Sequence, residues 1–324
     1  MPSLGRVLTA MVTPMTADRA LDLEGAQRLA VHLVEHGNDG LVVAGTTGES
    51  PTLTQAETLD LFSAVVGAVG DRATVVAGCG RNDTAATIDL TRKAAARGVH
   101  GVMLVAPYYN KPSQRGLQAH FLATAAATDL PVLVYNIPSR TGCEIAPTTL
   151  LRLAEAAPNI CGVKDAVGDL TKAAWLAARA PTTFEIWAGD DAILLPLLAV
   201  GGVGVVSVAG HLVGEDLARM VEVFPTNPDK AREIHFRLLA LFEALFVDTN
   251  PVPVKAALGM MGLPAGPVRP PLADADEACL AAVGEALSGI GREDSPAGPA
   301  AMPEPARQPT VNSGPGPARA SERT

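Results

Sequence analysis

The chain has few aromatic and few charged side chains. Phe, Trp and Tyr make up 4% of its 324 residues, Asp, Glu, Lys and Arg make up 18%, and acidic residues outnumber basic ones by 34 to 25. The resulting net charge of -9 argues against a nucleic-acid partner or an anionic membrane surface, because phosphate binding requires clustered Lys and Arg. With 48% hydrophobic residues, the composition is that of a globular protein with a large core.

Long apolar runs are also missing. A membrane-spanning helix needs about 18 to 20 apolar residues, and the richest stretch, residues 192–208, is interrupted by Pro196 and by glycines. The N-terminal segment MPSLGRVLTAMVTP has one basic side chain and an apolar run cut by Thr and Pro, unlike a secretory signal. We therefore expect a protein without a membrane segment that works in the cytoplasm.

Cysteines are sparse and form no CxxC pair. There are four of them, Cys79, Cys143, Cys161 and Cys279. A disulfide framework or a zinc site requires closer, patterned spacing. We expect reduced thiols, most of them buried.

Motifs for metals and nucleotide cofactors are absent as well. His32 and His36 are four residues apart on a predicted helix, but no third ligand is evident, so solvated or partly buried histidines are the better interpretation. The glycine-rich stretches at 78–80 and 201–204 lack the helix-opening glycine and the later acidic residue of a dinucleotide-binding fingerprint, and no P-loop occurs. The sequence predicts neither a metal nor an organic cofactor.

What the sequence does contain is a repeated pattern of short apolar runs, each followed by an alanine-rich helical segment. Near-continuous apolar strands that alternate with helices are typical of a parallel sheet covered on both faces. Eight such units fit an α/β fold of the closed (β/α)8 TIM barrel type better than an open, doubly wound sheet. The predicted strands lie within residues 7–14, 40–45, 74–79, 101–107, 131–137, 160–166, 184–190 and 202–208.

Beyond residue 210 the pattern becomes purely helical. The helical segments are 215–224, 228–246, 251–262 and 274–291. We predict a barrel over residues 1–225 and a C-terminal helical region over 226–294. Pro, Gly and Ala make up more than half of residues 295–324, so this last part is predicted to be a disordered tail.

Polar residues gather where the predicted strands end, which is where the active sites of such barrels lie. The second strand ends in GTTGES (45–50), where the hydroxyls of Thr46 and Thr47 and bare backbone N–H groups are suited to hold a carboxylate. An ordinary turn with helix-capping threonines is the alternative interpretation.

The three tyrosines of the chain lie at the fourth and fifth predicted strands. Two of the three in the chain, Tyr108 and Tyr109, are adjacent after the fourth strand, as part of a site or as a packing or interface pair. The third, Tyr135, lies inside the fifth strand, where its hydroxyl needs a polar partner. Arg140 follows on the next loop, after the turn at Pro138, where it is suited to bind a carboxylate; a plain surface charge is the alternative interpretation.

A lysine, Lys164, interrupts the apolar run of the sixth strand. Lysine is almost never fully buried unless it is paired, and the neighbouring Asp165 points to the opposite face of the strand. Desolvation lowers the pKa of an amine by up to several units and makes it a nucleophile that forms a Schiff base with a ketone. We favour this interpretation over a surface lysine whose stem alone is buried.

Taken together, GTTGES, PYYNKPSQRGLQAHF, YNIPSRTG, GVKDA, AGDD and GGVGVVSV resemble, in order and spacing, the 4-hydroxy-tetrahydrodipicolinate synthases of the pyruvate-dependent class I aldolase superfamily. The resemblance spans residues 5–290. It implies condensation of pyruvate with L-aspartate 4-semialdehyde in diaminopimelate and lysine biosynthesis. In this mechanism Lys164 forms an imine with pyruvate, and the enamine derived from it attacks the aldehyde.

The same resemblance assigns the other catalytic groups. Tyr135 would relay protons at Lys164, and Thr46 would link it to Tyr109. Tyr109 would come from a neighbouring subunit, which makes a dimer the minimal active unit and a homotetramer, a dimer of dimers, the expected assembly.

Substrate binding is assigned in the same way. Thr47 would help to hold the pyruvate carboxylate, Arg140 would grip the carboxylate of the aldehyde substrate, and Gly189 and Val206 would line the pyruvate pocket through their backbone. Because sugar-acid aldolases usually carry other residues in the SRTG loop, Arg140 favours the synthase. The alternatives are another pyruvate-dependent aldolase, such as a keto-sugar-acid, N-acetylneuraminate or 4-hydroxy-2-oxoglutarate lyase, and a non-catalytic small-molecule sensor on the same barrel.

The resemblance also bears on feedback inhibition. Lysine-inhibited members bind L-lysine at the dimer interface, near positions that match Ser50, Asn82 and Tyr108. They hold its α-amino group with a glutamate at the position of Ala86, and they often carry histidines at the positions of Gln55 and Thr58. Asp83 is expected to cap the following helix instead of replacing that glutamate. We therefore expect this chain to be insensitive to L-lysine.

Overall fold

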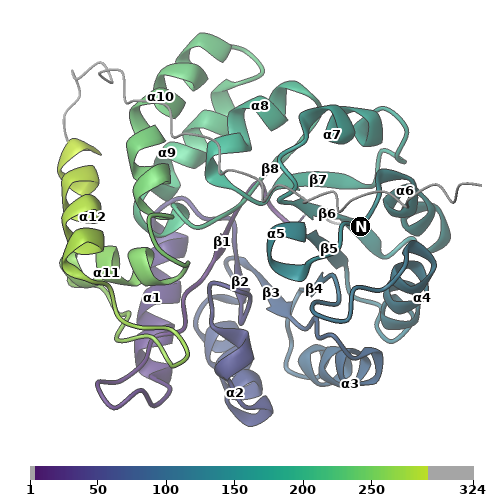
Figure 1. The fold of residues 1–324 in the computed structure, drawn as a ribbon, viewed down its shortest axis with the longest axis horizontal. Coiled ribbons are helices and arrows are strands. Elements are labelled where there is room, and N and C mark those ends of the chain that lie inside the picture. Colours follow the sequence, from purple (N-terminus) through teal and green to yellow (C-terminus); the bar gives the residue numbers. More distant parts are fainter. Residues whose placement is uncertain (1–3, 291–324) are drawn as a thin grey trace, which may run out of the picture.

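The computed structural model describes residues 4–290, and within them eight parallel strands close into a barrel (Figure 1). Each strand pairs with the next in chain order, and β8 pairs with β1. Each strand lies within one of the eight predicted apolar runs, so the predicted (β/α)8 barrel is confirmed. The strands are β1 (Val7–Ala10), β2 (Gly40–Val43), β3 (Thr74–Gly78), β4 (Gly101–Val105), β5 (Val132–Asn136), β6 (Ile160–Asp165), β7 (Glu185–Ala188) and β8 (Gly204–Ser207).

Helices surround the barrel and continue beyond it on one side (Figure 1). The helices of the barrel region are α1 (Leu23–Glu35), η1 (Ser50–Thr52), α2 (Gln55–Val69), α3 (Thr84–Ala95), α4 (Gln114–Ala125), α5 (Pro138–Thr141), α6 (Pro147–Ala156), α7 (Leu170–Ala177), η2 (Asp191–Ile193), α8 (Leu194–Ala199) and α9 (Gly210–Val223). Three more follow, α10 (Pro228–Ala244), α11 (Val252–Met260) and α12 (Glu277–Ile290). The division into a barrel over 1–225 and a helical region over 226–294 stays a prediction, and the predicted tail at 295–324 lies outside the described residues.

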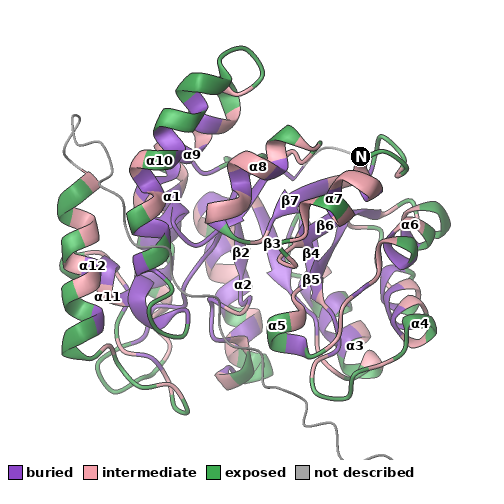
Figure 2. Cartoon of the chain, turned by 45° about the horizontal axis from the view of Figure 1, so that its top comes forward, coloured by how far each residue is buried: buried purple, intermediate pink, exposed green. Residues whose placement is uncertain are grey.

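The strands separate two apolar cores. In β5, Val132 and Val134 pack outward against the helices, whereas Leu133 and Tyr135 point into the barrel. This alternation follows from the two-residue period of a strand, and it explains why the runs are apolar throughout. Figure 2 shows the strands as the buried centre of the molecule, with exposed residues on the outer sides of the helices.

Local signals fix where several helices begin. Thr54 accepts a hydrogen bond from the backbone N–H of Glu57, whose carboxylate accepts one from the backbone N–H of Thr54, and this capping box starts α2. Asp22 and Asp169 cap α1 and α7 in a similar way. These caps hold the helices in place beside the strand ends that carry the polar residues.

The C-terminal helices pack on the barrel as a layer. Helix α10 contacts α9 and α12, and α11 contacts α9 and α12 (Figure 1). Among residues 4–290, no helix is long and apolar enough to cross a membrane. The four cysteines are free, and all but the partly buried Cys143 are buried, which confirms the prediction of mostly buried thiols.

Candidate active site

Lys164 and Tyr135 lie side by side inside the barrel. Strands β5 and β6 pair in a register that places Tyr135 opposite Lys164. The Lys164 Nζ lies 4.3 Å from the centroid of the Tyr135 ring. Each residue is 4% exposed, so Lys164 is a buried amine and not a surface lysine.

Burial changes the acidity of this amine. The pKa of Lys164 is lowered to about 8, chiefly by desolvation and also by the nearby Arg140, while Asp191 and Asp190 oppose the shift. At pH 7 roughly a tenth of such an amine is neutral, compared with less than about a thousandth for an ordinary lysine. Lys164 therefore has the property that a Schiff-base nucleophile requires.

The carboxylate of Asp191, at the start of η2 and shortly after β7, raises the pKa of Lys164. Asp191 is 1% exposed and accepts hydrogen bonds from the hydroxyl of Ser207 and from the backbone N–H groups of Val208 and Ala209 at 3.0 and 2.9 Å. Asp191 belongs to the AGDD motif, but no role was predicted for this aspartate from the sequence. The motif does not reveal which of its two aspartates is buried. In the structure Asp190 is exposed and Asp191 is buried.

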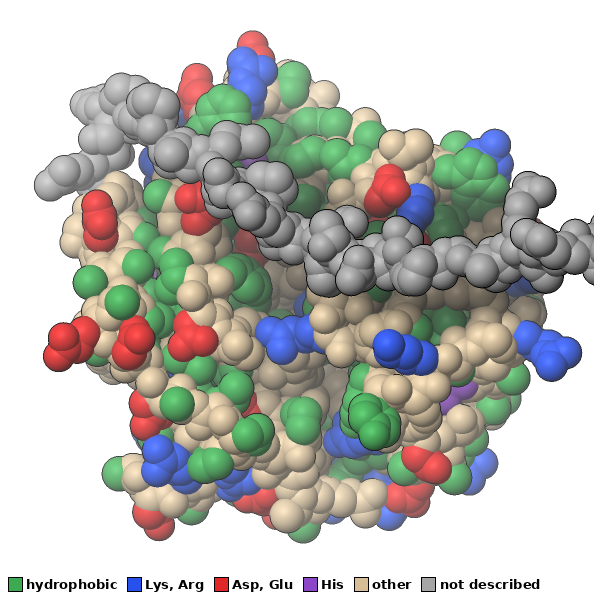
Figure 3. Space-filling model, in the orientation of Figure 1, with side chains coloured by type: hydrophobic (Ala, Val, Ile, Leu, Met, Phe, Trp, Pro, Cys, Tyr) green, Lys and Arg blue, Asp and Glu red, His purple; other side chains and the backbone are tan. Residues whose placement is uncertain are grey.

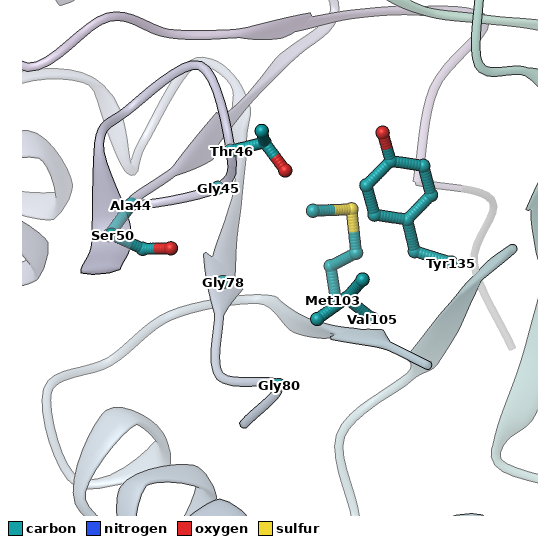
Figure 4. A pocket seen from close by; sticks show the side chains of 9 residues that line it. All are labelled: Ala44, Gly45, Thr46, Ser50, Gly78, Gly80, Met103, Val105 and Tyr135. Atoms are coloured by element: carbon teal, nitrogen blue, oxygen red, sulfur yellow. The ribbon is translucent and has the colours of Figure 1, made fainter. Parts of the chain in front are cut away.

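The phenol of Tyr135 keeps its proton at neutral pH. Burial raises the pKa of Tyr135 to about 12, while Arg140 and a hydrogen bond with Thr46 oppose the shift. Figure 4 shows the side chains of Thr46, Met103 and Tyr135 pointing toward a common space. A protonated phenol beside a neutral amine is arranged to donate and accept protons during imine chemistry.

The pocket around these side chains is small and combines backbone with few polar groups. A Cβ at Gly78 would lie 2.2 Å from the Ala44 carbonyl oxygen, and one at Gly80 would lie 2.4 Å from the Val105 backbone nitrogen, so glycine lets these strand ends approach each other. Met103 supplies an apolar side of the pocket. The sequence analysis did not single out Met103, although its place on a barrel strand was predicted. The lining residues are Ala44, Gly45, Thr46, Ser50, Gly78, Gly80, Met103, Val105 and Tyr135.

Thr47 and Arg140 are connected through a residue that the sequence analysis missed. The Asn250 amide donates a hydrogen bond to the Thr47 hydroxyl at 2.9 Å, and the Asn250 carbonyl oxygen accepts one from Arg140 at 3.5 Å. Asn250 and Thr47 are buried, and the side-chain oxygen of Asn250 has no hydrogen-bond partner among the described residues. Asn250 lies outside the barrel strands, just before α11, so the strand-end search did not reach it.

Arg140 was predicted on a loop but lies in the short helix α5 (Pro138–Thr141). Pro138 stands in the first turn of this helix, where its missing N–H costs nothing and its fixed φ favours the helical turn. The side chain of Arg140 is exposed and lies close enough to influence both Lys164 and Tyr135. A cation at the rim of a buried site is suited to bind an anionic substrate.

Gly189 and Val206 are placed around the barrel rather than at the pocket beside Thr46. The Gly189 N–H donates to the Asp165 carbonyl at 2.7 Å, and a Cβ at Gly189 would lie 2.7 Å from that of Ala166. Val206 is fully buried in the inner core that contains Tyr135. Neither residue lines the pocket formed by Thr46 and Tyr135.

Tyr109 is not part of the site within one chain. It is 89% exposed and has a φ of +74°, and its backbone N–H donates to the Thr141 carbonyl at 3.4 Å. The preceding Tyr108 is partly buried. The loop thus presents the phenol of Tyr109 on the surface.

Charged side chains are unevenly distributed over the molecule. On the face shown in Figure 3, Lys and Arg side chains lie near the centre, and acidic side chains gather along the edge formed by the last helices. Residues 4–290 contain no group of three or more His, Cys, Asp or Glu that could hold a metal ion. The rings of His32, in α1, and His36, which caps the C-terminus of α1, lie 4.0 Å apart, and His36 Nδ1 is 2.7 Å from the His32 carbonyl oxygen.

Comparisons with known proteins converge on one family. The model of the dihydrodipicolinate synthetase family matches residues 3–290. The chain is 59% identical over 272 residues to the 4-hydroxy-tetrahydrodipicolinate synthase of Moorella thermoacetica, covering 84% of this chain and 93% of the relative. It is 52% identical over 293 residues to the enzyme of that name from Symbiobacterium thermophilum, covering 90% and 99%.

Solved structures agree. The DHDPS of Cyanidioschyzon merolae with lysine bound superposes with a TM-score of 0.88 at 46% identity, covering 89% of this chain and 98% of the other. A dihydrodipicolinate synthase from Bacillus anthracis gives a TM-score of 0.88 at 42% identity, covering 90% and 100%.

Proposed function

Because the chain belongs to the dihydrodipicolinate synthetase family, we infer that it condenses pyruvate with L-aspartate 4-semialdehyde to 4-hydroxy-tetrahydrodipicolinate, in diaminopimelate and lysine biosynthesis. It is a lyase of the class I aldolase type. The observation that carries the chemistry is the buried Lys164 amine beside the Tyr135 phenol, with a pKa lowered to about 8. An amine of this kind is a nucleophile at neutral pH.

In the proposed mechanism, the neutral amine of Lys164 attacks the ketone carbon of pyruvate, and loss of water gives an imine. The imine withdraws electrons from the methyl group, so that loss of a methyl proton gives an enamine. The enamine carbon then bonds to the aldehyde carbon of L-aspartate 4-semialdehyde, and the aldehyde oxygen takes up a proton as a hydroxyl. Finally the amine of the second substrate attacks the imine carbon, closes the six-membered ring and releases Lys164.

Tyr135 is the proposed proton relay at Lys164. Its phenol is protonated at neutral pH and hydrogen-bonded to Thr46, so it can give a proton to the departing water and recover one through Thr46. We propose that Thr46 connects Tyr135 to a Tyr109 of a neighbouring subunit. The 89% exposure of Tyr109 supports this assignment, because an exposed phenol is available to a neighbour.

Substrate binding is assigned to the groups around this relay. The Thr47 hydroxyl and the backbone of its loop hold the pyruvate carboxylate, and Arg140 holds the carboxylate of the aldehyde substrate. Gly189 follows β7 and Val206 lies in β8, and we propose that their backbone atoms line bound pyruvate on the side of the barrel away from the pocket that Thr46 and Tyr135 line. The link from Thr47 through Asn250 to Arg140 supports the assignment, since it joins the two proposed carboxylate sites.

Sodium borohydride tests the mechanism. With pyruvate present, reduction should leave a stable adduct on Lys164 that mass spectrometry of peptides locates, and Lys164→Ala should lose it. A coupled assay with pyruvate and L-aspartate 4-semialdehyde should show turnover. An adduct on another lysine would contradict the assignment of Lys164, and imine formation without condensation would contradict the second substrate.

The assembly and the location of the enzyme are also proposals. We propose a homotetramer built as a dimer of dimers, in which Tyr109 crosses the dimer interface. Light scattering coupled to size-exclusion chromatography should give four times the mass of the 33.3 kDa chain. The four free cysteines support a reducing compartment, the cytoplasm, and cell fractionation tests this.

A further inference from the structure

A second buried lysine, outside the proposed catalytic groups, forms an ion pair with the GTTGES loop. The Nζ of Lys255, in α11, lies 2.6 Å from Oε1 of Glu49. Glu49 is 2% exposed and Lys255 is 4% exposed. Two charges removed from water are costly unless they are paired and hydrogen-bonded, so the pair must be held in a defined geometry.

The remaining hydrogen-bonding capacity of the pair is used locally. The other carboxylate oxygen of Glu49 accepts a hydrogen bond from the Arg269 backbone N–H at 2.8 Å, and Lys255 Nζ also donates to the Pro267 carbonyl at 2.8 Å. The Arg269 guanidinium in turn pairs with Glu57 at the start of α2. The loop after β2 is thus fastened to two separate parts of the C-terminal region.

The backbone of Glu49 indicates that the carboxylate is what the position requires. Its φ of +55° lies in the left-handed region, where glycine or asparagine is the less strained choice. The backbone conformation therefore does not favour a glutamate at this position. Its two oxygen contacts, to Lys255 and to the Arg269 N–H, are the interactions that offset the strain.

Each partner is joined to the proposed substrate site by a short path. The Glu49 backbone N–H donates to the Thr46 carbonyl at 3.0 Å, so the ion pair bears directly on the loop that carries Thr46 and Thr47. On the other side, α11 begins two residues after Asn250, whose amide donates to Thr47 and whose carbonyl accepts from Arg140. Displacement of α11 from the loop would move Asn250 relative to both carboxylate-binding residues.

We propose that Glu49 and Lys255 are positioning residues, which hold α11 against the GTTGES loop and set the spacing of Thr47, Asn250 and Arg140. The inference rests on the proposed function and extends the active site to the C-terminal helical region. Neither residue contacts the reacting atoms. The pair acts through the geometry of the groups that bind the two substrates, where a displacement of about 1 Å is enough to cost a hundredfold in rate.

The test compares Glu49→Gln, Lys255→Met and the double variant, with Arg237→Met as matched control. Arg237 pairs with Asp216 at 2.6 Å and ties α10 to α9, away from the loop. Active sites are counted by borohydride trapping with pyruvate, so that kcat and KM are expressed per functional site and misfolded protein does not contribute. Thermal unfolding is measured in parallel.

We expect each single variant to lower kcat/KM per site about tenfold to a hundredfold for both substrates, whereas Arg237→Met stays within twofold of wild type. The double variant, which leaves no uncompensated charge, should regain much of the melting temperature but not the kinetics. Double-variant enzyme with wild-type kcat/KM, or single variants that lower only the melting temperature, would overturn the proposal.

A failure of the proposed second substrate can be distinguished from a failure of the positioning role. If wild type forms the pyruvate imine but does not condense it with L-aspartate 4-semialdehyde, the proposed second substrate is wrong. The positioning role is then decided by the rate of pyruvate imine formation, which uses Lys164, the Tyr135 relay and the loop that carries Thr47 but not the second substrate. An unchanged imine rate in both single variants would overturn it in that case.

Discussion

Lys164 and Lys255 have the same exposed fraction, 4%, but opposite surroundings. Lys255 has a carboxylate oxygen of Glu49 at 2.6 Å and a carbonyl oxygen of Pro267 at 2.8 Å. Lys164 lies 4.3 Å from the centroid of the Tyr135 ring. Burial lowers the pKa of both amines, but at Lys255 the charge and hydrogen bond of Glu49 oppose the shift.

The comparison shows that burial alone does not make a lysine a nucleophile. Desolvation acts on both amines, and the partner decides which protonation state is retained. A contacting carboxylate keeps Lys255 as a structural cation. The carboxylate of Asp191 already accepts hydrogen bonds from a hydroxyl and two backbone N–H groups. It therefore opposes the lowering of the Lys164 pKa but does not fix the proton on that amine.

The sharpest contrast is expected from removing each amine. Lys164→Ala should abolish the borohydride-trapped pyruvate adduct and lower kcat by at least about 10^4-fold, because no other group supplies the covalent intermediate. Lys255→Met should still form the adduct on Lys164. Trapping on intact protein followed by peptide mass spectrometry measures both. A pyruvate adduct on Lys255 in wild type would reverse the distinction.

The next effect concerns the phenol assigned to the neighbouring subunit. Tyr109→Phe should lower kcat about 100-fold with little change in pyruvate affinity, because a proton relay acts in the transition state and not in ground-state binding. Tyr108→Phe, the adjacent tyrosine, serves as control and should change kcat far less. Steady-state kinetics and pyruvate titration separate the two quantities. If only affinity fell in Tyr109→Phe, the residue would be a packing residue.

The pH dependence of imine formation should report Lys164 alone. The attacking form is the neutral amine, so below its pKa of about 8 the rate of imine formation should fall roughly tenfold per pH unit. Above that pH the rate should level off. Rapid-mixing measurements of imine formation between pH 6 and about 10.5 test this. Lys255→Met, whatever its absolute rate, should show the same pH profile. A rate that keeps rising beyond about pH 9.5 would mean that Lys164 titrates as an ordinary lysine.

The barrel and the buried position of Lys164 could be predicted from the sequence for the same physical reason. A period-two strand that is apolar on both faces is recognisable from its composition, and a lysine inside such a run conflicts with it. Lys255 sits in a helical segment, PVPVKAALGMMG, that is apolar apart from this lysine, and a lysine on a helix can bury its stem while its ammonium group reaches solvent. Its burial depends on Glu49, which is 206 residues away in the chain, and no local pattern reports a contact of that range.

The same limit explains Asn250 and the loop residues. The strand-end rule located Thr46, Thr47 and Arg140, because each follows a strand that the pattern predicts. Asn250 reaches Thr47 from the segment that precedes α11, so its place depends on how the C-terminal helices pack. The short helix that carries Arg140 was also missed, since four residues are too few for a periodic signal.

A buried ammonium group needs an anionic partner, and this requirement also applies to L-lysine bound as a feedback inhibitor. A bound L-lysine near Ser50 and Asn82 would need an anionic partner for its α-amino group, as Lys255 needs Glu49. The candidate Asp83 accepts a hydrogen bond from the Ala86 N–H at 2.6 Å and caps α3, as predicted. Gln55 donates to Asp89 and accepts from Lys93, so it is engaged as well.

Loss of a carboxylate that pairs a bound ammonium typically costs about 2 to 5 kcal/mol, on the order of 30-fold to several thousand-fold in affinity. We therefore expect L-lysine at about 1 mM to change the rate of condensation by less than about twofold. Ala86→Glu is the informative variant, because it restores a carboxylate one helical turn after Asn82 and should make the enzyme more sensitive to L-lysine. Half-maximal inhibition of wild type well below 1 mM would show that another group holds the ammonium.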